Sequence, residues 1–286
     1  MPELPEVETI ARGVNVRVRG DRILEAWFGS HREPFKTSPV RQAKHLVERQ
    51  IQSVHRIGKH IVMELGPQGR GSAAGEPEKN TASIAAQWIV HLGMTGRLLV
   101  TTPDTPVAKH THARLTLESG QELRFVDPRR FGRLEFRDLN RDKKFTGPGA
   151  EPLTIAAADF AELFRTRKLA IKAALLNQTL LAGVGNIYAD ESLFRAGIRP
   201  RKRAGRLTKL ELEELRKALR QILEHAIRLG GSSVSDYVDA EGAPGFFQLE
   251  HCVYQRTGEP CRKCGNPIRR IVVAGRSTHY CSQCQR

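Results

Sequence analysis

Apolar residues near the start of the chain recur three or four positions apart, which is the spacing of one helix face. They are Val7, Ile10, Ala11, Val14 and Val18. Pro5 suits the first turn of such a helix, because a proline there removes no internal hydrogen bond. The pattern predicts a helix over residues 6–19.

From about residue 22 to residue 134 the pattern changes to short apolar stretches, several of which alternate with polar positions. They read ILEAWF, IQSVHRI, HIVMEL, AAQWIVHLG, RLLVTT, ARLTLES, ELRFVD and RLEFRD. Glycine, proline or aspartate separates them, which is typical of antiparallel strands joined by turns. We expect a sandwich of two antiparallel sheets. Residues 66–83 hold few bulky apolar residues and are expected to form a surface insertion between strands.

A Pro/Gly-rich boundary, KFTGPGAEPLT, precedes segments with helical periodicity. Four helices are expected, in AAADFAELFRTR, LAIKAALLNQ, IYADESLFRAG and TKLELEELRKALRQILEHAIRLGG. Thr208 and Glu211 have the spacing of a capping box at the start of the last one, and Gly230 and Gly231 end it. The chain is therefore predicted to be α+β with two main parts, a β-rich part and then a helical part.

Four of the five cysteines form two Cys-x2-Cys pairs separated by sixteen residues. They are Cys261, Cys264, Cys281 and Cys284. This arrangement predicts one structural zinc ion, held by a hairpin with strands at residues 268–273 and 277–280. Disulfides are the alternative, and a cytosolic location argues against them. The fifth residue, Cys252, is interpreted as a small buried hydrophobe and not as a ligand.

The charge of the chain indicates a polyanionic partner. Lysine and arginine number 46 against 31 acidic residues, giving a net charge of +15. Residues 192–210 contain no acid and seven basic residues. Nucleic acid is the favoured partner. A membrane surface is the weaker alternative, since no bulky apolar helix face accompanies the run and no apolar stretch approaches the length of a membrane span. No signal peptide is visible, so we expect a cytosolic protein.

Three segments have compositions that suit nucleic-acid contact. NQTLLAGVGNIYADESLF places a turn with two glycines before Asn186, and helix starts bind phosphates; alternatively, Asn186 is a plain N-cap. FVDPRRFGRLEF presents arginines and Phe131 for base reading and wedging. The equally weighted alternative is a core phenylalanine with solvated arginines. HLGMTGRL offers Met94, for which a core position is favoured.

Taken together, and in this order, the motifs resemble those of formamidopyrimidine-DNA glycosylase, a bacterial repair-enzyme family for oxidised purines. The matching segments are PELPEVE, the lysine of GKHIV, HLGMTG, KHTH, DPRRFG, GVGNIYADESLF and the four-cysteine hairpin. The resemblance covers nearly the whole chain, and the sequence departs from the family pattern at the insertion over residues 66–83. It implies a sandwich domain over residues 1–149, a helix–two-turn–helix domain over residues 150–231, and a lesion-capping loop with a zinc finger over residues 232–286.

The resemblance implies that the enzyme removes 8-oxoguanine and formamidopyrimidines from duplex DNA. Strand cleavage by β,δ-elimination would follow through a Schiff base on Pro2, once Met1 is removed. An α-amine suits this role, because its pKa of about 7.7–8.0 leaves a useful neutral fraction at cellular pH. Glu3 would act as general acid and Glu6 would support it.

Further roles are implied residue by residue. Lys59 would contact the lesion phosphate and assist β-elimination, and Arg276 would grip phosphate and assist δ-elimination. Residues of four motifs, together with Arg167, would contact DNA or fill the hole left by the extruded base. They are His110, Arg167, Asn186, Met94, Arg129 and Phe131. Arg167 is a weaker match, because lysine is common there. Residues 232–247 would close over the flipped purine.

Two alternatives compete with this interpretation. One is the sister enzyme endonuclease VIII, which prefers oxidised pyrimidines and shares the fold and nucleophile. PELPEVE, the complete set of hole-filling residues and the GAPGFF loop favour the purine enzyme. The other is a zinc-containing protein that binds DNA without cutting it, which would have no need of Pro2 and Glu3. In either case we expect a monomer on damaged duplex DNA, with no membrane partner.

Overall fold

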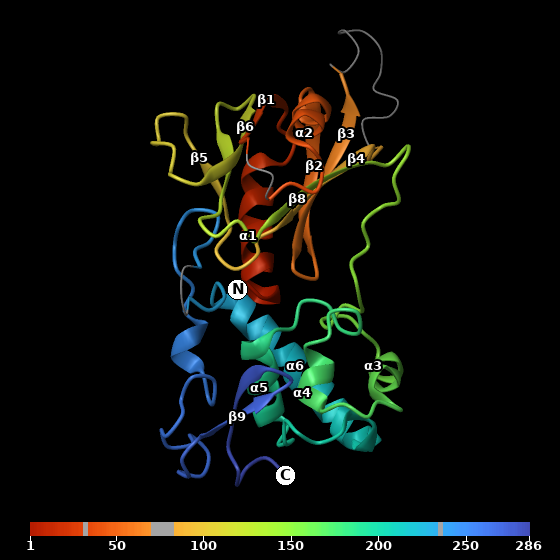
Figure 1. Ribbon diagram of the computed structural model, residues 1–286, viewed down its shortest axis with the longest axis vertical. Coiled ribbons are helices and arrows are strands. Elements are labelled where there is room, and N and C mark those ends of the chain that lie inside the picture. The colour runs from red at the N-terminus through yellow and green to blue at the C-terminus, as the bar shows by residue number, and fades with distance from the viewer. Residues whose placement is uncertain (31–33, 70–82, 234–236) are drawn as a thin grey trace. The chain divides into compact units, whose positions relative to one another are not determined.

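The computed structural model describes residues 1–30, 34–69, 83–233 and 237–286 (Figure 1). The chain divides into two compact units. Unit one contains Met1–Pro2, Glu6–Thr146 and Ser233–Gly245. Unit two contains Glu3–Pro5, Gly147–Ser232 and Phe246–Arg286. Most of the predicted insertion lies outside the described residues.

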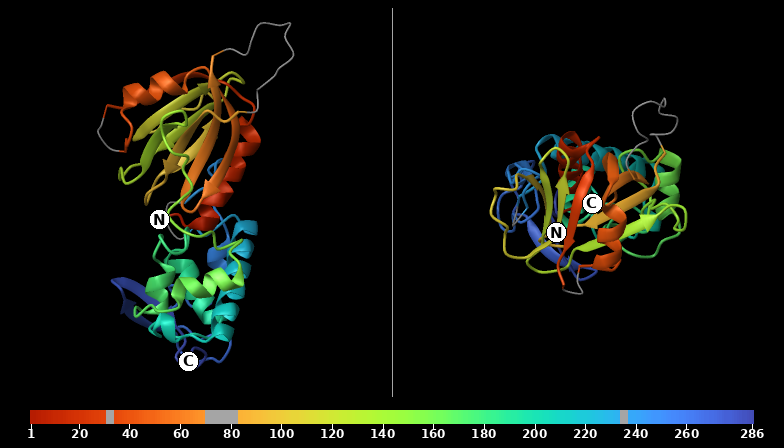
Figure 2. Two further views of the ribbon diagram at one scale, coloured as in Figure 1. Left: turned by 90° about the vertical axis from the view of Figure 1, so that its right-hand side faces the viewer. Right: turned by 90° about the horizontal axis from the view of Figure 1, so that it is seen from above.

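Unit one is built on two four-stranded sheets in which every strand pair is antiparallel. The first sheet has the order β1-β6-β7-β5 and the second β2-β3-β4-β8. The strands are β1 (Ile23–Phe28), β2 (Arg49–Ile57), β3 (His60–Gln68), β4 (Ala86–His91), β5 (Arg97–Thr101), β6 (Thr111–Leu117), β7 (Glu122–Val126) and β8 (Arg133–Asp138). Figure 2 shows the two layers. The predicted sandwich is confirmed.

Helix α1 (Leu4–Val18) contributes its apolar face to the same core as the two sheets. All five apolar residues named for this helix are buried, so the periodicity located the face correctly. The short helix α2 (Pro39–Leu46) was not predicted; Ser38 caps it by accepting a hydrogen bond from Arg41 N at 3.3 Å. Its Gln42 accepts a bond from the buried Trp88 indole at 2.9 Å.

Unit one also includes a segment from late in the chain. Val100 N donates to Ala240 O at 3.1 Å, and Ala240 is buried in the core cluster. A Cβ on Gly13 would lie 3.1 Å from that of Ala240, so the helix passes close to the segment. Tyr237 is buried here too, and burial together with Glu6 raises the pKa of its phenol. The loop predicted over residues 232–247 is thus divided between the two units.

Unit two is helical and ends in the cysteine-bearing hairpin. Its elements are α3 (Ala157–Phe164), α4 (Ile171–Leu175), α5 (Asn186–Arg195), α6 (Lys209–Arg228), β9 (Arg269–Val273) and β10 (Arg276–Tyr280), with short 3-10 turns at Ala204–Arg206 and Phe247–Glu250. Thr208 and Glu211 form the predicted capping box, with bonds of 3.2 and 2.9 Å. Gly230 and Gly231 follow with φ of 74° and 83°, which only glycine adopts readily.

Helix α4 is shorter than its sequence pattern predicts. The Asn177 side chain accepts bonds from Thr179 N at 3.0 Å and Thr179 Oγ1 at 2.8 Å. This local turn competes with a further helical turn, so α4 ends at Leu175. None of the helices in the described part of the chain combines the length and apolar character that a membrane span requires.

His251 provides a pH test of unit two. It is 4% exposed, its Nε2 lies 3.2 Å from Ser232 Oγ, and its ring contacts Phe247 and Tyr254 with centroids 5.4 Å apart. Burial, with the nearby Arg262, lowers the pKa of His251 to about 4. The unfolded chain, with a pKa near 6.5, then binds more protons than the folded one between pH 6.5 and 4.

We therefore expect the free energy of unfolding to fall as the pH drops through this window, with His251 accounting for up to about 3 kcal/mol. His251→Gln should flatten the dependence when urea unfolding is compared at pH 7 and pH 4.5. The exposed His110 is the control, and His110→Gln should keep the wild-type slope. An unchanged slope in His251→Gln would contradict the assignment.

Candidate functional site

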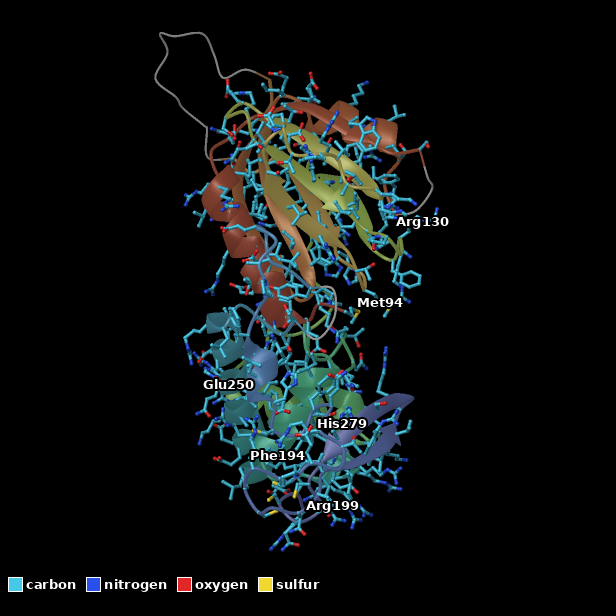
Figure 3. The ribbon with its side chains drawn as sticks, turned by 90° about the vertical axis from the view of Figure 1, so that its left-hand side faces the viewer. Met94, Arg130, Phe194, Arg199, Glu250 and His279 are labelled. Atoms are coloured by element: carbon cyan, nitrogen blue, oxygen red, sulfur yellow. The ribbon has the colours of Figure 1, made fainter. Side chains whose placement is uncertain are left out.

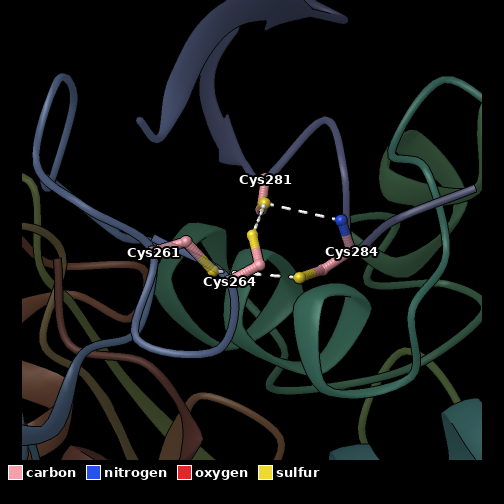
Figure 4. Close-up of side chains that lie close together, drawn as sticks. All are labelled: Cys261, Cys264, Cys281 and Cys284. Atoms are coloured by element: carbon pink, nitrogen blue, oxygen red, sulfur yellow. Dashed lines mark hydrogen bonds between the residues drawn. The ribbon is translucent and has the colours of Figure 1, made fainter. Parts of the chain in front are cut away.

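The four paired cysteines converge in unit two (Figure 4). Their sulfur atoms all lie within 4.8 Å of one another, with Sγ–Sγ distances of 3.9 Å for Cys261–Cys284 and 3.5 Å for Cys264–Cys281. A zinc tetrahedron with bonds of about 2.3 Å requires sulfur separations of about 3.8 Å. The donor set therefore fits one zinc ion with no open position, and the predicted structural zinc site is confirmed.

The hairpin strands support this cluster, as their sequence predicted. Positive φ angles at Ala274 (48°) and Gly275 (73°) make the tight turn between β9 and β10, with Arg276 paired to Val273. Cys252 lies outside the cluster, is half-buried, and has its backbone N bonded to the Glu191 carboxylate at 2.9 Å. Burial raises the pKa of its thiol, which suits a residue that is not a ligand.

Two cysteine variants test the zinc site. Cys261→Ser should lose bound zinc and lower the thermal midpoint, because three thiolates and a hydroxyl bind zinc poorly. Cys252→Ser is the matched control and should keep one zinc per chain. Zinc content is measured by atomic absorption together with a thermal melt. Full zinc occupancy in Cys261→Ser would mean that the site is misassigned.

Glu3 lies at the start of helix α5. Its carboxylate accepts hydrogen bonds from Ile187 N at 3.1 Å and Tyr188 N at 3.4 Å, and the residue is 4% exposed. The helix N-cap is Gly185, which has no side chain to satisfy these groups. Glu3 therefore supplies from a distant part of the sequence the acceptor that a capping side chain would otherwise provide.

The GVG sequence makes this seating possible. A Cβ on Gly185 would lie 2.2 Å from Glu3 Cδ, and one on Gly183 would lie 2.9 Å from Leu4 Cβ. Gly183 also has φ of +90°, and its carbonyl accepts a bond from Leu4 N at 3.0 Å. The two glycines leave room for the N-terminal segment. The alternative of Asn186 as a plain N-cap is wrong, because Gly185 is the N-cap and Asn186 is the first residue of α5. The Asn186 Nδ2 donates to Ser277 O at 2.9 Å.

Gly185→Ala isolates the effect of this contact. Gly185 has φ of −129°, so alanine introduces no backbone strain and only its Cβ displaces Glu3. For the strand cleavage that the resemblance implies, we expect a fall of about a hundredfold, as for other misplacements of about 1 Å, while zinc content is kept. Gly29→Ala is the control, since its Cβ meets only contacts of 3.8 Å or more. Cleavage at the wild-type rate in Gly185→Ala would refute the role of the seat.

A buried ion pair in unit two carries the next part of the site. Lys172 Nζ lies 2.7 Å from Asp190 Oδ1, and both side chains are 0% exposed. Lys172 also donates to Ser277 O at 2.8 Å and Thr278 Oγ1 at 2.9 Å, while Asp190 Oδ2 accepts from His279 N at 2.9 Å. Burial lowers the pKa of Lys172, and Asp190 opposes that shift. The pair ties α4 and α5 to β10, on which Figure 3 labels His279.

This network brings two predicted site residues together. Ser277 O accepts bonds from both Lys172 and Asn186, and Arg276 is the residue immediately before it. Arg276 is exposed, so its guanidinium is available to an anion. The start of α5 and the start of β10 therefore place Asn186 and Arg276 close to each other.

In unit one a single buried residue, Asp127, bonds to three of the motif loops through its carboxylate and its backbone. Asp127 is 0% exposed. Its Oδ1 accepts from Thr95 Oγ1 at 2.7 Å and its Oδ2 from Gly132 N at 2.7 Å. Its backbone N donates to His110 O at 3.0 Å, and its carbonyl lies 2.9 Å from His112 Nε2. HLGMTG, KHTH and DPRRFG thus meet at one residue.

These loops present the three residues expected to fill the hole left by an extruded base. Met94 is 41% exposed and Phe131 is 47% exposed, and the Arg129 guanidinium lies 4.9 Å from the Phe131 ring centroid. Gly93, with φ of +64°, allows the loops to touch, because a Cβ there would lie 2.4 Å from Phe131 C. The interpretations of Met94 and Phe131 as core residues are therefore wrong. Met94 is labelled in Figure 3.

The remaining predicted residues have varied surroundings. Lys59 is buried in the turn between β2 and β3. His110 is exposed and has φ of +71°. Arg167 is half-buried, and its Nε donates to Leu163 O at 2.6 Å at the end of α3. Part of the Arg167 side chain is therefore used to close a helix, which weakens its assignment to DNA.

The basic run of residues 195–209 is also partly used within unit two. Arg199 Nε donates to Gln285 O at 3.1 Å, and Lys202 pairs with Glu211. The clustering of these basic residues in the sequence predicts a surface that binds nucleic acid, whereas several of the side chains bind within unit two.

The sequence patterns predict no role for Asp127, Lys172 or Asp190. Asp127 and Asp190 lie inside two of the matched motifs, DPRRFG and GVGNIYADESLF. Their place in these motifs is the one feature of the sequence that could have identified them.

An N-terminal β-sandwich, a helical domain with a glycine turn before α5 and a four-cysteine finger together define a class of DNA-repair glycosylases. Family models match residues 1–134 as formamidopyrimidine-DNA glycosylase N-terminal domain, 147–238 as its H2TH domain, and 258–286 as a zinc finger found in FPG and IleRS. The chain belongs to the formamidopyrimidine-DNA glycosylase family.

Relatives of full length support this. The formamidopyrimidine-DNA glycosylase of Solibacter usitatus is 46% identical over 286 residues and that of Cronobacter sakazakii 40% over 290, each comparison covering both chains completely. Lactococcus lactis Fpg in complex with abasic-site DNA has a TM-score of 0.84 at 35% identity, covering 99% of both chains. MutM (Fpg) of Thermus thermophilus has a TM-score of 0.82 at 38% identity, covering 99% of this chain and 98% of that one.

Proposed function

We propose that this chain excises oxidised purines from duplex DNA and cleaves the strand at the resulting site, with Pro2 as the nucleophile. The observation that carries the proposal is the seating of Glu3, the neighbour of Pro2, on the start of α5. A protein that only binds DNA has no need of an N-terminal acid fixed by a helix start. Lactococcus lactis Fpg has been solved in complex with Fapy-dG-containing DNA, as a mutant, and with DNA containing an abasic site.

The first step is attack by the Pro2 nitrogen on C1′ of the damaged nucleotide. The bond between C1′ and the base breaks, and the base leaves with the proton that the Pro2 nitrogen loses as it bonds to C1′. Loss of the sugar ring C–O bond then gives a cationic iminium between Pro2 and C1′. A secondary α-amine suits this step, because its pKa of about 7.7–8.0 leaves a neutral fraction at neutral pH.

Glu3 handles protons and charge in this scheme. Two helix N–H groups and the positive end of the helix dipole favour its ionised form. It accepts the proton of the Pro2 ammonium, which frees the nucleophile, and returns a proton to the sugar ring oxygen as the ring opens. Its negative charge also stabilises the iminium.

Phosphate contacts follow from the cationic and helix-start residues. Lys59 contacts the phosphate of the lesion and assists removal of the C2′ proton in β-elimination. Arg276 and Asn186, which the Ser277 carbonyl brings close together, hold a phosphate through δ-elimination. His110 and Arg167 contact the backbone at other positions.

Extrusion of the damaged base requires that the hole in the stack be filled. Met94, Arg129 and Phe131 do this, with Arg129 facing the orphaned cytosine. The exposure of Met94 and Phe131 supports the role, because a side chain must be accessible at the surface to enter the base stack. We also propose that residues 232–247, of which 234–236 lie outside the described residues, cover the flipped purine.

We also propose that the domains divide at residues 149 and 231. The enzyme then acts as a monomer in the bacterial cytoplasm.

Borohydride trapping tests the nucleophile. A duplex with 8-oxoguanine opposite cytosine should give a covalent adduct that peptide mass analysis locates on Pro2. Pro2→Gly should keep duplex affinity and lose strand cleavage by about a hundredfold or more, because the secondary amine is gone. Cleavage at an unchanged rate would sink the assignment. An adduct on another residue would move the chemistry elsewhere.

The same assay addresses the pyrimidine-specific alternative. Wild-type Lactococcus lactis Fpg has been solved in complex with DNA that contains an oxidised pyrimidine, so a family member can bind such a lesion. We expect trapping on the 8-oxoguanine duplex to exceed trapping on a duplex with an oxidised pyrimidine. The reverse order would favour the sister activity.

A further inference from the structure

A groove on unit one contains none of the residues assigned to catalysis, and it adjoins the DNA-contacting set through His110 and Arg130. Its volume is about 540 Å³, within the range of ligand-binding clefts. It is formed by the end of β1, the segment leading into β6 and the loop after β7. The lining residues are Trp27, Gly29, Ser30, Lys109, His110, Thr111, His112, Pro128 and Arg130. None of these described lining residues is acidic.

Trp27 is the unusual feature of this groove. Its side chain is 47% exposed, whereas Trp88, the other tryptophan of the chain, is 1% exposed in the core. The ring extends toward Gly29, since Trp27 Cη2 lies 3.8 Å from the position of a Cβ there. A glycine at that position adds no side chain over the indole. The exposed indole therefore lies in one groove with the side chains of Lys109 and Arg130.

The cations of the groove are held by the backbone that organises the base-wedging loops. Arg130 has φ of 58°, and its backbone N donates to Asp127 O at 3.3 Å. Lys109 directly precedes His110, whose carbonyl accepts a bond from Asp127 N at 3.0 Å. The buried Asp127 therefore fixes both sides of the groove. Figure 3 labels Arg130 at the surface of unit one.

An exposed aromatic beside a cationic groove is the arrangement with which proteins bind single-stranded nucleic acid. Cations take the phosphates, and the aromatic face takes a base that is out of its stack. A duplex hides its base faces, so duplex DNA would use Lys109 and Arg130 but leave the indole face unused. We infer that this groove binds unpaired DNA, with a base stacked on Trp27 and phosphates on Lys109 and Arg130. This activity goes beyond lesion excision and does not depend on it.

Tryptophan fluorescence tests the inference directly, because only Trp27 is exposed. Titration of the full-length wild-type protein with a short oligothymidine should quench its emission. An undamaged duplex of the same length should quench it much less. Trp27→Phe keeps an aromatic ring and reports Trp88 alone, so its emission should not respond to either DNA. Equal quenching by duplex and single strand would overturn the inference, since the groove would then take duplex backbone.

Fluorescence anisotropy of a labelled oligothymidine gives the affinities. Trp27→Ala should bind about tenfold more weakly and Trp27→Phe within about threefold of wild type, since base–aromatic stacking is lost in only one of them. Lys109→Gln should bind more weakly and lower the salt slope by about 0.7, the value for one phosphate on a single strand. Lys44→Gln is the matched control, an exposed lysine outside the groove, and should change the slope less. Wild-type single-strand affinity in Trp27→Ala would refute the site.

Borohydride trapping on the 8-oxoguanine duplex, with the same preparations, separates this inference from the proposed function. Trp27→Ala should give the wild-type yield of adduct. Adduct without single-strand quenching in the wild type would disprove the groove and leave the enzyme assignment intact. Quenching without adduct would leave the groove and disprove the enzyme assignment.

Discussion

The seating of the N-terminal segment on the start of helix α5 is the contact on which the rest of the site depends. A helix start presents N–H groups that need acceptors, and Gly185 has no side chain to supply one. Glu3 meets that need with two bonds, and Gly183 and Gly185 leave the space for it. A chain terminus, which is usually frayed, is thereby fixed. An N-terminal amine can be positioned for chemistry only if the residues beside it are held in this way.

Buried charges organise the loops on both units, each within its own surroundings. Asp127 joins three loops of unit one, and the Lys172–Asp190 pair joins two helices to the zinc hairpin in unit two. A buried charge is costly unless hydrogen bonds satisfy it, so each of these residues tolerates few alternative loop arrangements. We interpret them as positioning residues. They hold the exposed side chains Met94, Phe131 and Arg276, which are among the residues proposed to contact DNA.

Local patterns were sufficient for most of the elements. Period-two alternation identified the strands, helical spacing identified the buried face of α1, and the Thr208–Glu211 pair identified the start of α6. Patterns failed where a short-range bond decided the outcome. Ser38 starts the unpredicted α2, and Asn177 ends α4 early. Hydrophobicity predicts burial for Met94 and Phe131. Both side chains are exposed, because the buried Asp127 fixes the loops that carry them.

The sequence by itself determined the chemistry that is local along the chain. The four-cysteine spacing specified a zinc site, and the ordered motifs specified the family, because ligand type and spacing are properties of short segments. Only the tertiary structure decided which distant residues meet. Glu3 lies 184 residues from Ile187 and Lys172 lies 105 residues from Ser277, and no periodicity encodes such contacts. They arise because a buried donor or acceptor must find a partner wherever the fold brings one within reach.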